Sequence, residues 1–290
     1  MNHEYGVRPP AFRLPEATHV GAVTLAVADL DRSLDYYREV IGLHLLTRAG
    51  HTATLGTPDE RPIVRLEAHA GLRPAPRRGA FGLYHFAILL PDRAFLGRFV
   101  GHLGRFGVQV GMADHLVSEA LYLTDPDGLG IEVYADRPRT SWRTRGQELA
   151  MTTEPLDVRS LLQAGGHAPW DGVPAGTVMG HMHLHVGDLS QAEAFYHGAL
   201  GMDKVVWSYP GALFLSAGGY HHHLGTNTWS PGPSARPDEA RLLEWTLHVP
   251  SSADVDAVAS SVTTAGYAAT RDDDGNVRVG DPWGTVVRIR

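Results

Sequence analysis

The stretch DHLVSEALYLTDPDGLGIE, residues 114–132, carries the strongest local structural signal in the chain. Asp-Pro followed by Asp-Gly, at 125–128, is a strong turn signal. The apolar runs on either side of it, 121–123 and 131–134, therefore predict the two strands of a hairpin. Glu132 falls in the second strand, where a carboxylate is costly to bury unless a positive group pairs with it. A metal ion shared with histidines from elsewhere in the chain is the simplest such partner.

Composition limits what kind of protein this can be. A chain of 290 residues is long enough for two domains. Its net charge of −7 gives no basic footprint for nucleic acid, and no run of about 18 apolar residues predicts a membrane span. The polar N-terminus MNHEYGVRPP has no apolar signal core, which favours a cytoplasmic protein. With no cysteine, the chain has no disulfide or thiolate site, so any metal must use carboxylates and its 17 histidines.

One pattern occurs four times along the chain: an apolar strand, a polar cap and then an amphipathic helix. The caps are Asp29, Asp92, Asp188 and Ser251. The first two caps are 63 residues apart, and so are the last two, whereas the middle gap is 96. The sequence therefore predicts two pairs of modules separated by an insert of about 33 residues.

We place the modules at 17–70, 80–137, 178–230 and 241–290. Each continues from its helix into about three short β-rich runs, such as 52–55 with 63–67 in the first module and 212–216 with 222–227 in the third. The segment 138–177, rich in Pro, Gly, Arg and Thr, predicts a linker with one short helix around Pro155 to Gln163.

This order of strand, helix and three strands resembles the βαβββ module of the vicinal-oxygen-chelate superfamily. That superfamily includes glyoxalase, bleomycin-resistance proteins and extradiol ring-cleaving dioxygenases. The resemblance covers nearly the whole chain apart from its ends and the linker. It implies an α+β fold in which four βαβββ modules form two open β-barrel domains, with a metal inside a barrel.

The superfamily places metal ligands near the start of a module's first strand and in its last strand. The inner modules carry His85, His181 and Glu132 at these positions, whereas the outer modules carry Ala22, Glu244 and Arg288. Two histidines and one carboxylate match the facial triad of non-haem Fe(II) oxygenases, and Mn(II) suits the same ligands.

The placement of these ligands bears on how the modules pair. The triad closes only if modules two and three share the catalytic barrel, which leaves modules one and four as a structural half. Pairing of neighbours is the alternative. It would put His85 and Glu132 in one barrel, with Glu67 as a further candidate ligand, and leave His181 alone in the other.

The residues around the proposed metal sharpen the resemblance. The pattern H-x₅-L-Y-x₂-D-P-x-G-x₃-E, from His115 to Glu132, is very similar to the motif of extradiol catechol dioxygenases. The run GGYHH at 218–222 resembles the strand of those enzymes that carries an acid–base histidine. The resemblance thus implies His222 as the acid–base group, with His115 and Tyr122 binding substrate oxygen. Because strand side chains alternate, we expect His221 and His223 to face the other way. We interpret His183 and His185 as structural.

The implied activity is extradiol cleavage of catechol, or of a substituted catechol, by O₂. The partners would then be a small aromatic diol and O₂. Two rivals stay open: a metal-dependent isomerase or lyase of the glyoxalase kind, and a bleomycin-resistance-like protein that binds a ligand without chemistry. Taken singly, a histidine or tyrosine on a strand is more often a core or surface residue than a catalyst. The sequence leaves the oligomeric state open, a homo-oligomer included.

Overall fold

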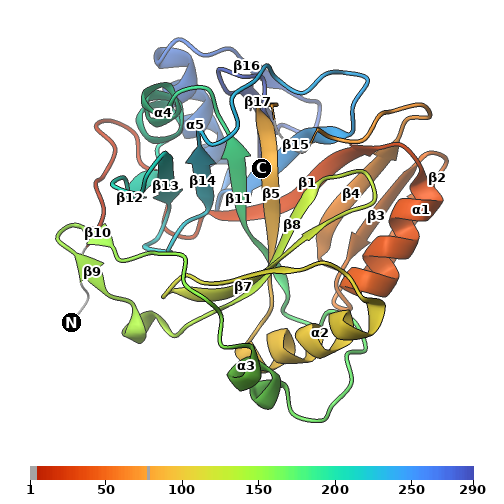
Figure 1. Cartoon of the computed structure of the whole chain (residues 1–290). Helices are drawn as coiled ribbons and strands as arrows, with labels where there is room; N and C mark the ends of the chain where they lie inside the picture. Colours follow the sequence, from red (N-terminus) through yellow and green to blue (C-terminus); the bar gives the residue numbers. More distant parts are fainter. Residues whose placement is uncertain (1–4, 77–78) are drawn as a thin grey trace.

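The computed structural model describes residues 5–76 and 79–290. Two mixed sheets of eight strands each dominate it, with a few helices packed against them (Figure 1). The α+β fold expected from the sequence is thereby confirmed, and each βαβββ module is present in chain order.

The first sheet joins strands from 80–137 to strands from 178–230. Its strand order is β12-β13-β14-β11-β5-β8-β7-β6. In that order the strands are Asp203–Val206, Ala212–Ser216, Leu224–Asn227, Val178–His185, Gly82–Leu89, Gly130–Asp136, Ser118–Thr124 and Gly111–Asp114. The antiparallel contact between β11 and β5 at its centre brings the two modules together.

The second sheet joins strands from the two ends of the chain in the same way. Its order is β16-β17-β18-β15-β1-β4-β3-β2. In that order the strands are Ala269–Arg271, Val277–Gly280, Val286–Ile289, Arg241–His248, His19–Val27, Pro62–Ala68, Thr52–Gly56 and His44–Ala49. Here β1 and β15 form the central antiparallel contact.

Each module helix begins at the polar cap that ends its first strand. The caps Asp29, Asp92, Asp188 and Ser251 all accept a hydrogen bond from the first helical turn, which satisfies an otherwise unpaired amide. The helices are α1 (Leu30–Asp35), α2 (Arg93–Phe106), α4 (Leu189–Ala192) and α5 (Ser252–Thr264). Both α1 and α4 continue into π-helical turns, Tyr36–Ile41 and Glu193–Ala199, and Gly42 ends the first with φ 88°.

The linker departs from its expected form at the helix boundary. Asp157 caps the helix by accepting from the amide of Ser160, so α3 spans Val158–Gly165 and begins three residues after Pro155. A short hairpin of β9 (Thr144–Arg145) and β10 (Glu148–Leu149) and a 3₁₀ turn (Arg139–Ser141) precede it. None of the helices in the described ranges is long and apolar enough to cross a membrane.

The expected hairpin around the Asp-Pro-Asp-Gly turn is confirmed. Strands β7 and β8 pair antiparallel, with Tyr122 opposite Glu132. The turn closes through a hydrogen bond from the amide of Gly128 to the carbonyl of Asp125, and Gly128 adopts φ 88°, which favours glycine. Tyr122 and Glu132 therefore lie on one face of the sheet.

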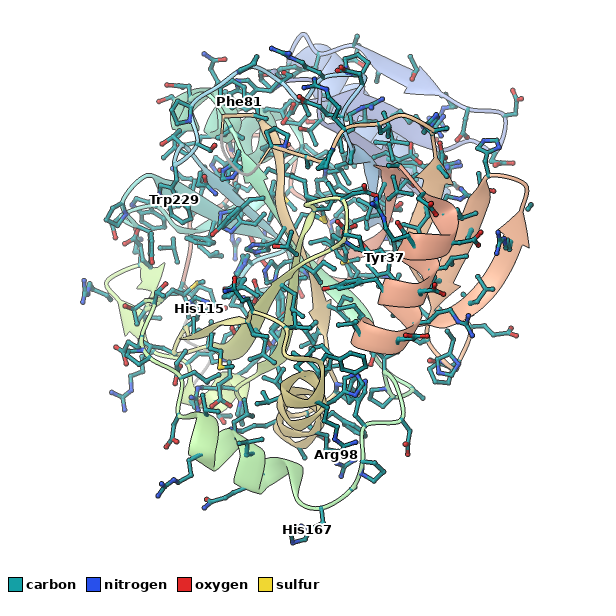
Figure 2. The ribbon with its side chains drawn as sticks, turned by 45° about the vertical axis from the view of Figure 1, so that its right-hand side comes forward. Tyr37, Phe81, Arg98, His115, His167 and Trp229 are labelled. Carbon is teal, nitrogen blue, oxygen red and sulfur yellow. The ribbon has the colours of Figure 1, made fainter. Side chains whose placement is uncertain are left out.

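A buried tyrosine fastens each Asp-Pro turn to the helix of the preceding module. The Tyr37 hydroxyl donates to Asp125 at 3.0 Å, and the Tyr196 hydroxyl donates to Asp281 at 2.8 Å. Figure 2 labels Tyr37 beside the orange helical segment that carries it. Since the sheets join module two to three and one to four, while these tyrosines join one to two and three to four, all four modules interlock.

Tyr37→Phe tests this interlock. We expect it to lower the free energy of unfolding by roughly 1.5–3 kcal/mol, because it removes a buried hydrogen bond to a carboxyl group. Urea unfolding would measure the change. The neighbouring Tyr36→Phe is a matched control, since the buried Tyr36 hydroxyl has no hydrogen-bond partner in the described ranges and its loss should cost little. Equal destabilisation by both variants would contradict the role given to the Tyr37 bond.

Candidate metal centre and its pocket

Three adjacent strands bring His85, Glu132 and His181 together. His85 lies on β5, Glu132 on the neighbouring β8 and His181 on β11 at the other side of β5. Ala87 is the register partner of both Glu132 and His181. Because side chains alternate along a strand, His85 lies on the same face as Ala87, whose small side chain leaves room between the larger ones.

The donor atoms of these residues are close enough to share one ion. The Oε2 of Glu132 lies 2.9 Å from His85 Nε2 and 3.2 Å from His181 Nε2. One ligand atom from each residue lies within 4.8 Å of the other two, and all three side chains are buried. This spread is compatible with ligands that each lie about 2.0–2.3 Å from a common ion.

The geometry at His85 fits a metal better than a hydrogen bond. Although its Nε2 is near Glu132, it has no partner with hydrogen-bond geometry among the described residues, and it is shielded from solvent. A buried ring nitrogen without a partner is costly. Such an orphan is expected where donor atoms face a shared cation instead of each other.

The charge states of His85, His181 and Glu132 also favour a bound metal ion. Burial lowers the pKa of His85 and of His181, so both imidazoles are neutral. Burial alone would raise the pKa of Glu132, whereas a facing positive charge, which His181 and His85 carry only when protonated, lowers it well below its ordinary value. With both imidazoles neutral, the carboxylate needs another positive partner. An oxygen and nitrogen donor set of this kind suits a divalent cation such as Fe(II) or Mn(II).

A second pair of side chains, His115 and Tyr122, borders the same space. Their Nε2 and hydroxyl lie 2.6 Å apart, and His115 Nδ1 lies 2.7 Å from the backbone carbonyl of Thr152. A carbonyl can only accept, so His115 Nδ1 carries its proton, and in the neutral ring Nε2 accepts from Tyr122. The linker, through Thr152, therefore fixes the tautomer of a residue in module two.

His222 reaches the pocket from a loop and not from a strand. Strand β14 begins at Leu224, two residues later than expected, because Gly218 and Gly219 adopt φ 59° and 63° and turn the chain before it. The His222 ring lines the pocket and lies against that of His181, with centroids 4.1 Å apart. Its Nδ1 is 2.8 Å from Nδ1 of His221, which is fully buried behind it.

All six predicted site residues line one pocket of about 140 Å³. Sequence reasoning missed most of its walls, which are largely aromatic: Tyr84, Met151, Thr153, Tyr209, Phe214 and Trp229. It also assigned His183 to a structural role, whereas the His183 ring lines this pocket with a buried Nε2 that lacks a partner among the described residues. The alternation of His181, His183 and His185 on one strand was the available signal.

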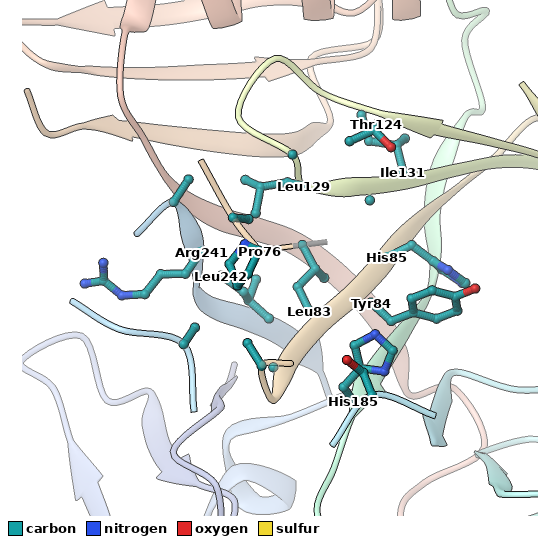
Figure 3. A pocket seen from close by; sticks show the side chains of 18 of the residues that line it. Pro76, Leu83, Tyr84, His85, Thr124, Leu129, Ile131, His185, Arg241 and Leu242 are labelled. Atoms are coloured by element: carbon teal, nitrogen blue, oxygen red, sulfur yellow. The ribbon is translucent and has the colours of Figure 1, made fainter. Parts of the chain in front are cut away.

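A larger cleft of about 1060 Å³ adjoins the pocket between the two sheets. Figure 3 shows Tyr84, His85 and His185 gathered on one side of this cleft, with Leu242 and Arg241 across from them. Three residues, Tyr84, His85 and Tyr122, line both spaces, so they form part of the wall between them.

The chain is similar to known proteins of one superfamily. The family model described as Glyoxalase/Bleomycin resistance protein/Dioxygenase superfamily matches residues 19–133 and 178–289. A catechol-2,3-dioxygenase of Bacillus subtilis (strain 168) is 45% identical over 273 residues, which cover 92% of this chain and 95% of that protein.

Two solved structures share the fold. An inferred dioxygenase from Bacillus subtilis subsp. subtilis str. 168 superposes with a TM-score of 0.67 at 16% identity, covering 96% of this chain and 86% of that one. Glyoxalase I from Zea mays superposes with a TM-score of 0.57 at 18% identity, covering 94% and 92%. At these identities the structures establish the fold alone.

Replacing His85 tests the metal centre. We expect His85→Ala to weaken Mn(II) binding by more than the roughly 10–100-fold that loss of an outer-shell partner costs, because it removes a direct ligand. Calorimetric titration of the full chain with Mn(II) would measure this. His183→Ala is the matched control: it removes another buried histidine of the same pocket that lies outside the three-donor group. Equal weakening by both variants would argue against His85 as a ligand.

Proposed function

Since the chain belongs to the Glyoxalase/Bleomycin resistance protein/Dioxygenase superfamily, we propose that it is an extradiol dioxygenase that cleaves catechol, or a substituted catechol, beside the vicinal hydroxyls. One observation carries the proposal. The three-donor group, the His115–Tyr122 pair and the His222 ring all converge on one small pocket. The name of the 45% identical relative supports the same activity.

His85, His181 and Glu132 would hold a divalent ion, Fe(II) in our proposal, with Mn(II) suited to the same donors. When bound, such an ion supplies chelation of the catechol oxygens and reaction with O₂. Two neutral imidazoles and one carboxylate leave the loaded site with a net positive charge. That charge favours binding of a catechol in its deprotonated form.

Tyr122 and His115 act on one substrate hydroxyl. Because the Tyr122 hydroxyl donates to His115 Nε2, its oxygen is free to accept a hydrogen bond from a catechol hydroxyl. A proton that leaves the substrate can then move through Tyr122 to His115 Nε2. If His115 takes that proton, the bond reverses and Tyr122 donates to the substrate oxyanion, a charge-assisted contact.

His222 is the proposed acid–base group on the opposite wall. Its Nδ1 is engaged by His221, which leaves Nε2 for the pocket. Burial, and then the neighbouring His181 and His221, hold the pKa of His222 well below its ordinary value, so the ring is a neutral acceptor. A proton accepted at Nε2 can later be returned to the product.

The pocket sets the class of substrate. Its volume of about 140 Å³ is well below the roughly 300 Å³ at which pockets begin to hold drug-sized ligands, which suits a single ring. Its lining contains no lysine or arginine, so it offers no permanently charged partner for a substrate carboxylate. Its aromatic walls pack against a ring and exclude water from the reacting groups.

Oxygen uptake tests the proposed function. We expect the full chain, reconstituted anaerobically with Fe(II), to consume O₂ on addition of catechol and to form a yellow ring-opened product. The His85→Ala chain, treated identically, should consume none. Absence of uptake by the unaltered chain with every catechol tried would refute the dioxygenase assignment and favour an isomerase or a ligand-binding protein.

Two variants separate the proposed roles. His222→Phe should lower turnover by roughly 10²–10⁴-fold while metal and catechol binding persist, because it removes an acid–base group that is not a ligand. Tyr122→Phe should be milder, costing about 1.5–3 kcal/mol for one hydrogen bond to a charged oxygen. Steady-state oxygen uptake, with metal content measured on the same samples, distinguishes them. Full turnover in His222→Phe would show that His222 is not the acid–base group.

A further inference from the structure

A chain of hydrogen bonds runs from the pocket to Asp136 at the end of strand β8. His222 Nδ1 lies 2.8 Å from His221 Nδ1, and His221 Nε2 lies 2.9 Å from Oδ1 of Asp136. His221 is fully buried between these two partners. Asp136 ends strand β8, four residues after Glu132, and its side chain is 27% exposed.

The carboxylate of Asp136, at the end of this series of hydrogen bonds, determines which atom donates in each of them. An ionised carboxylate only accepts, so His221 Nε2 must carry a proton. A neutral imidazole has only one N–H, so with that proton on Nε2 the Nδ1 of His221 is an acceptor. The short Nδ1–Nδ1 contact then requires His222 to donate from Nδ1, and its Nε2 is left bare.

We propose that Asp136 and His221 are positioning residues that fix the tautomer of His222, so that its bare Nε2 faces the pocket. The inference rests on the proposed function for its catalytic consequence, because a base must present a lone pair to the proton that it accepts. Without the hydrogen bonds that link it to His221 and Asp136, the neutral His222 ring could equally carry its proton on Nε2. The orientation of a histidine by the partner of its other nitrogen is a general device.

Neighbouring side chains hold the hydrogen-bonded His221 in place. The His221 ring packs against Tyr220 with centroids 4.1 Å apart and against Trp142 at 5.4 Å. The Tyr220 hydroxyl also donates to Asp136 Oδ1, at 3.2 Å. Packing therefore fixes the ring of His221, while the carboxylate fixes which nitrogen carries the proton.

The tautomer can be observed directly. In ¹⁵N-labelled full-length protein at pH 8, with and without diamagnetic Zn(II), His222 should show a protonated Nδ1 and a bare Nε2. His222→Phe identifies its resonances. Asp136→Asn should shift the proton to Nε2, because an amide can donate to His221 and reverse each bond. A wild-type His222 protonated at Nε2, or a tautomer unchanged in Asp136→Asn, would overturn the inference. The wild-type spectrum alone decides it if the variant fails to fold.

Turnover provides the second readout. Asp136→Asn should lower kcat by about 10²-fold or more with little change in KM or metal content, within the range for a positioned acid–base group. Tyr220→Phe is the matched control: it removes a different hydrogen bond to the same carboxylate, and kcat should stay within about threefold of wild type. An equal loss in both variants would contradict the proposal.

A double variant tests whether Asp136 acts through His221 or through a general effect of its charge. His221→Asn keeps an oxygen that can accept from His222 Nδ1 but no longer reaches Asp136. In that background Asp136→Asn should change kcat by less than about twofold, since coupled residues are not additive. A full additional loss would show that Asp136 acts by another route. If the unaltered chain consumes no O₂, the proposed function fails, while the NMR measurement still decides the tautomer.

Discussion

The buried carboxylate of Glu132 is the constraint on which the rest of this structure depends. Removing a carboxylate from water costs several kcal/mol unless a positive partner offsets it, and its buried neighbours His85 and His181 are neutral imidazoles. A shared cation resolves this only if strands from two modules, 96 residues apart at their caps, lie side by side. The β11–β5 contact and the interlocking tyrosines Tyr37 and Tyr196 hold the strands in that arrangement.

Much of the fold could be predicted because its signals are local. The Asp-Pro-Asp-Gly turn defines the β7–β8 hairpin and sets Tyr122 opposite Glu132. The helix caps repeat with the same 63-residue spacing within each pair, and this spacing predicted the modules. The joining of modules two and three in one sheet is a long-range property, and only the pattern of missing ligands at Ala22, Glu244 and Arg288 indicated it. The roles of the six site residues stay predictions, although the structure brings them to one pocket.

Other parts of the site were beyond sequence reasoning because they depend on tertiary contacts. The carbonyl of Thr152 orients His115, yet a backbone carbonyl leaves no trace in residue type. Asp136 reaches His221 across 85 positions of sequence, which no periodicity encodes. The glycines before the triple-histidine run turn it into a loop, so the strand alternation expected there does not apply. In the first two cases a residue of the linker or of another module completes a contact that its own segment cannot specify.

The second sheet shows how the same architecture behaves when the ligands are exchanged. Arg288 stands where the first sheet has Glu132, and Glu244 stands where it has His85. Arg288 lies 3.5 Å from Glu244 and 2.6 Å from Asp272, while Arg278 also donates to Glu244 at 2.8 Å. There the positive charge is part of the chain itself, so the carboxylates need no ion. The first sheet keeps its carboxylate and has only neutral histidines beside it, and this difference, more than the fold the two sheets share, is what makes one of them a candidate for metal chemistry.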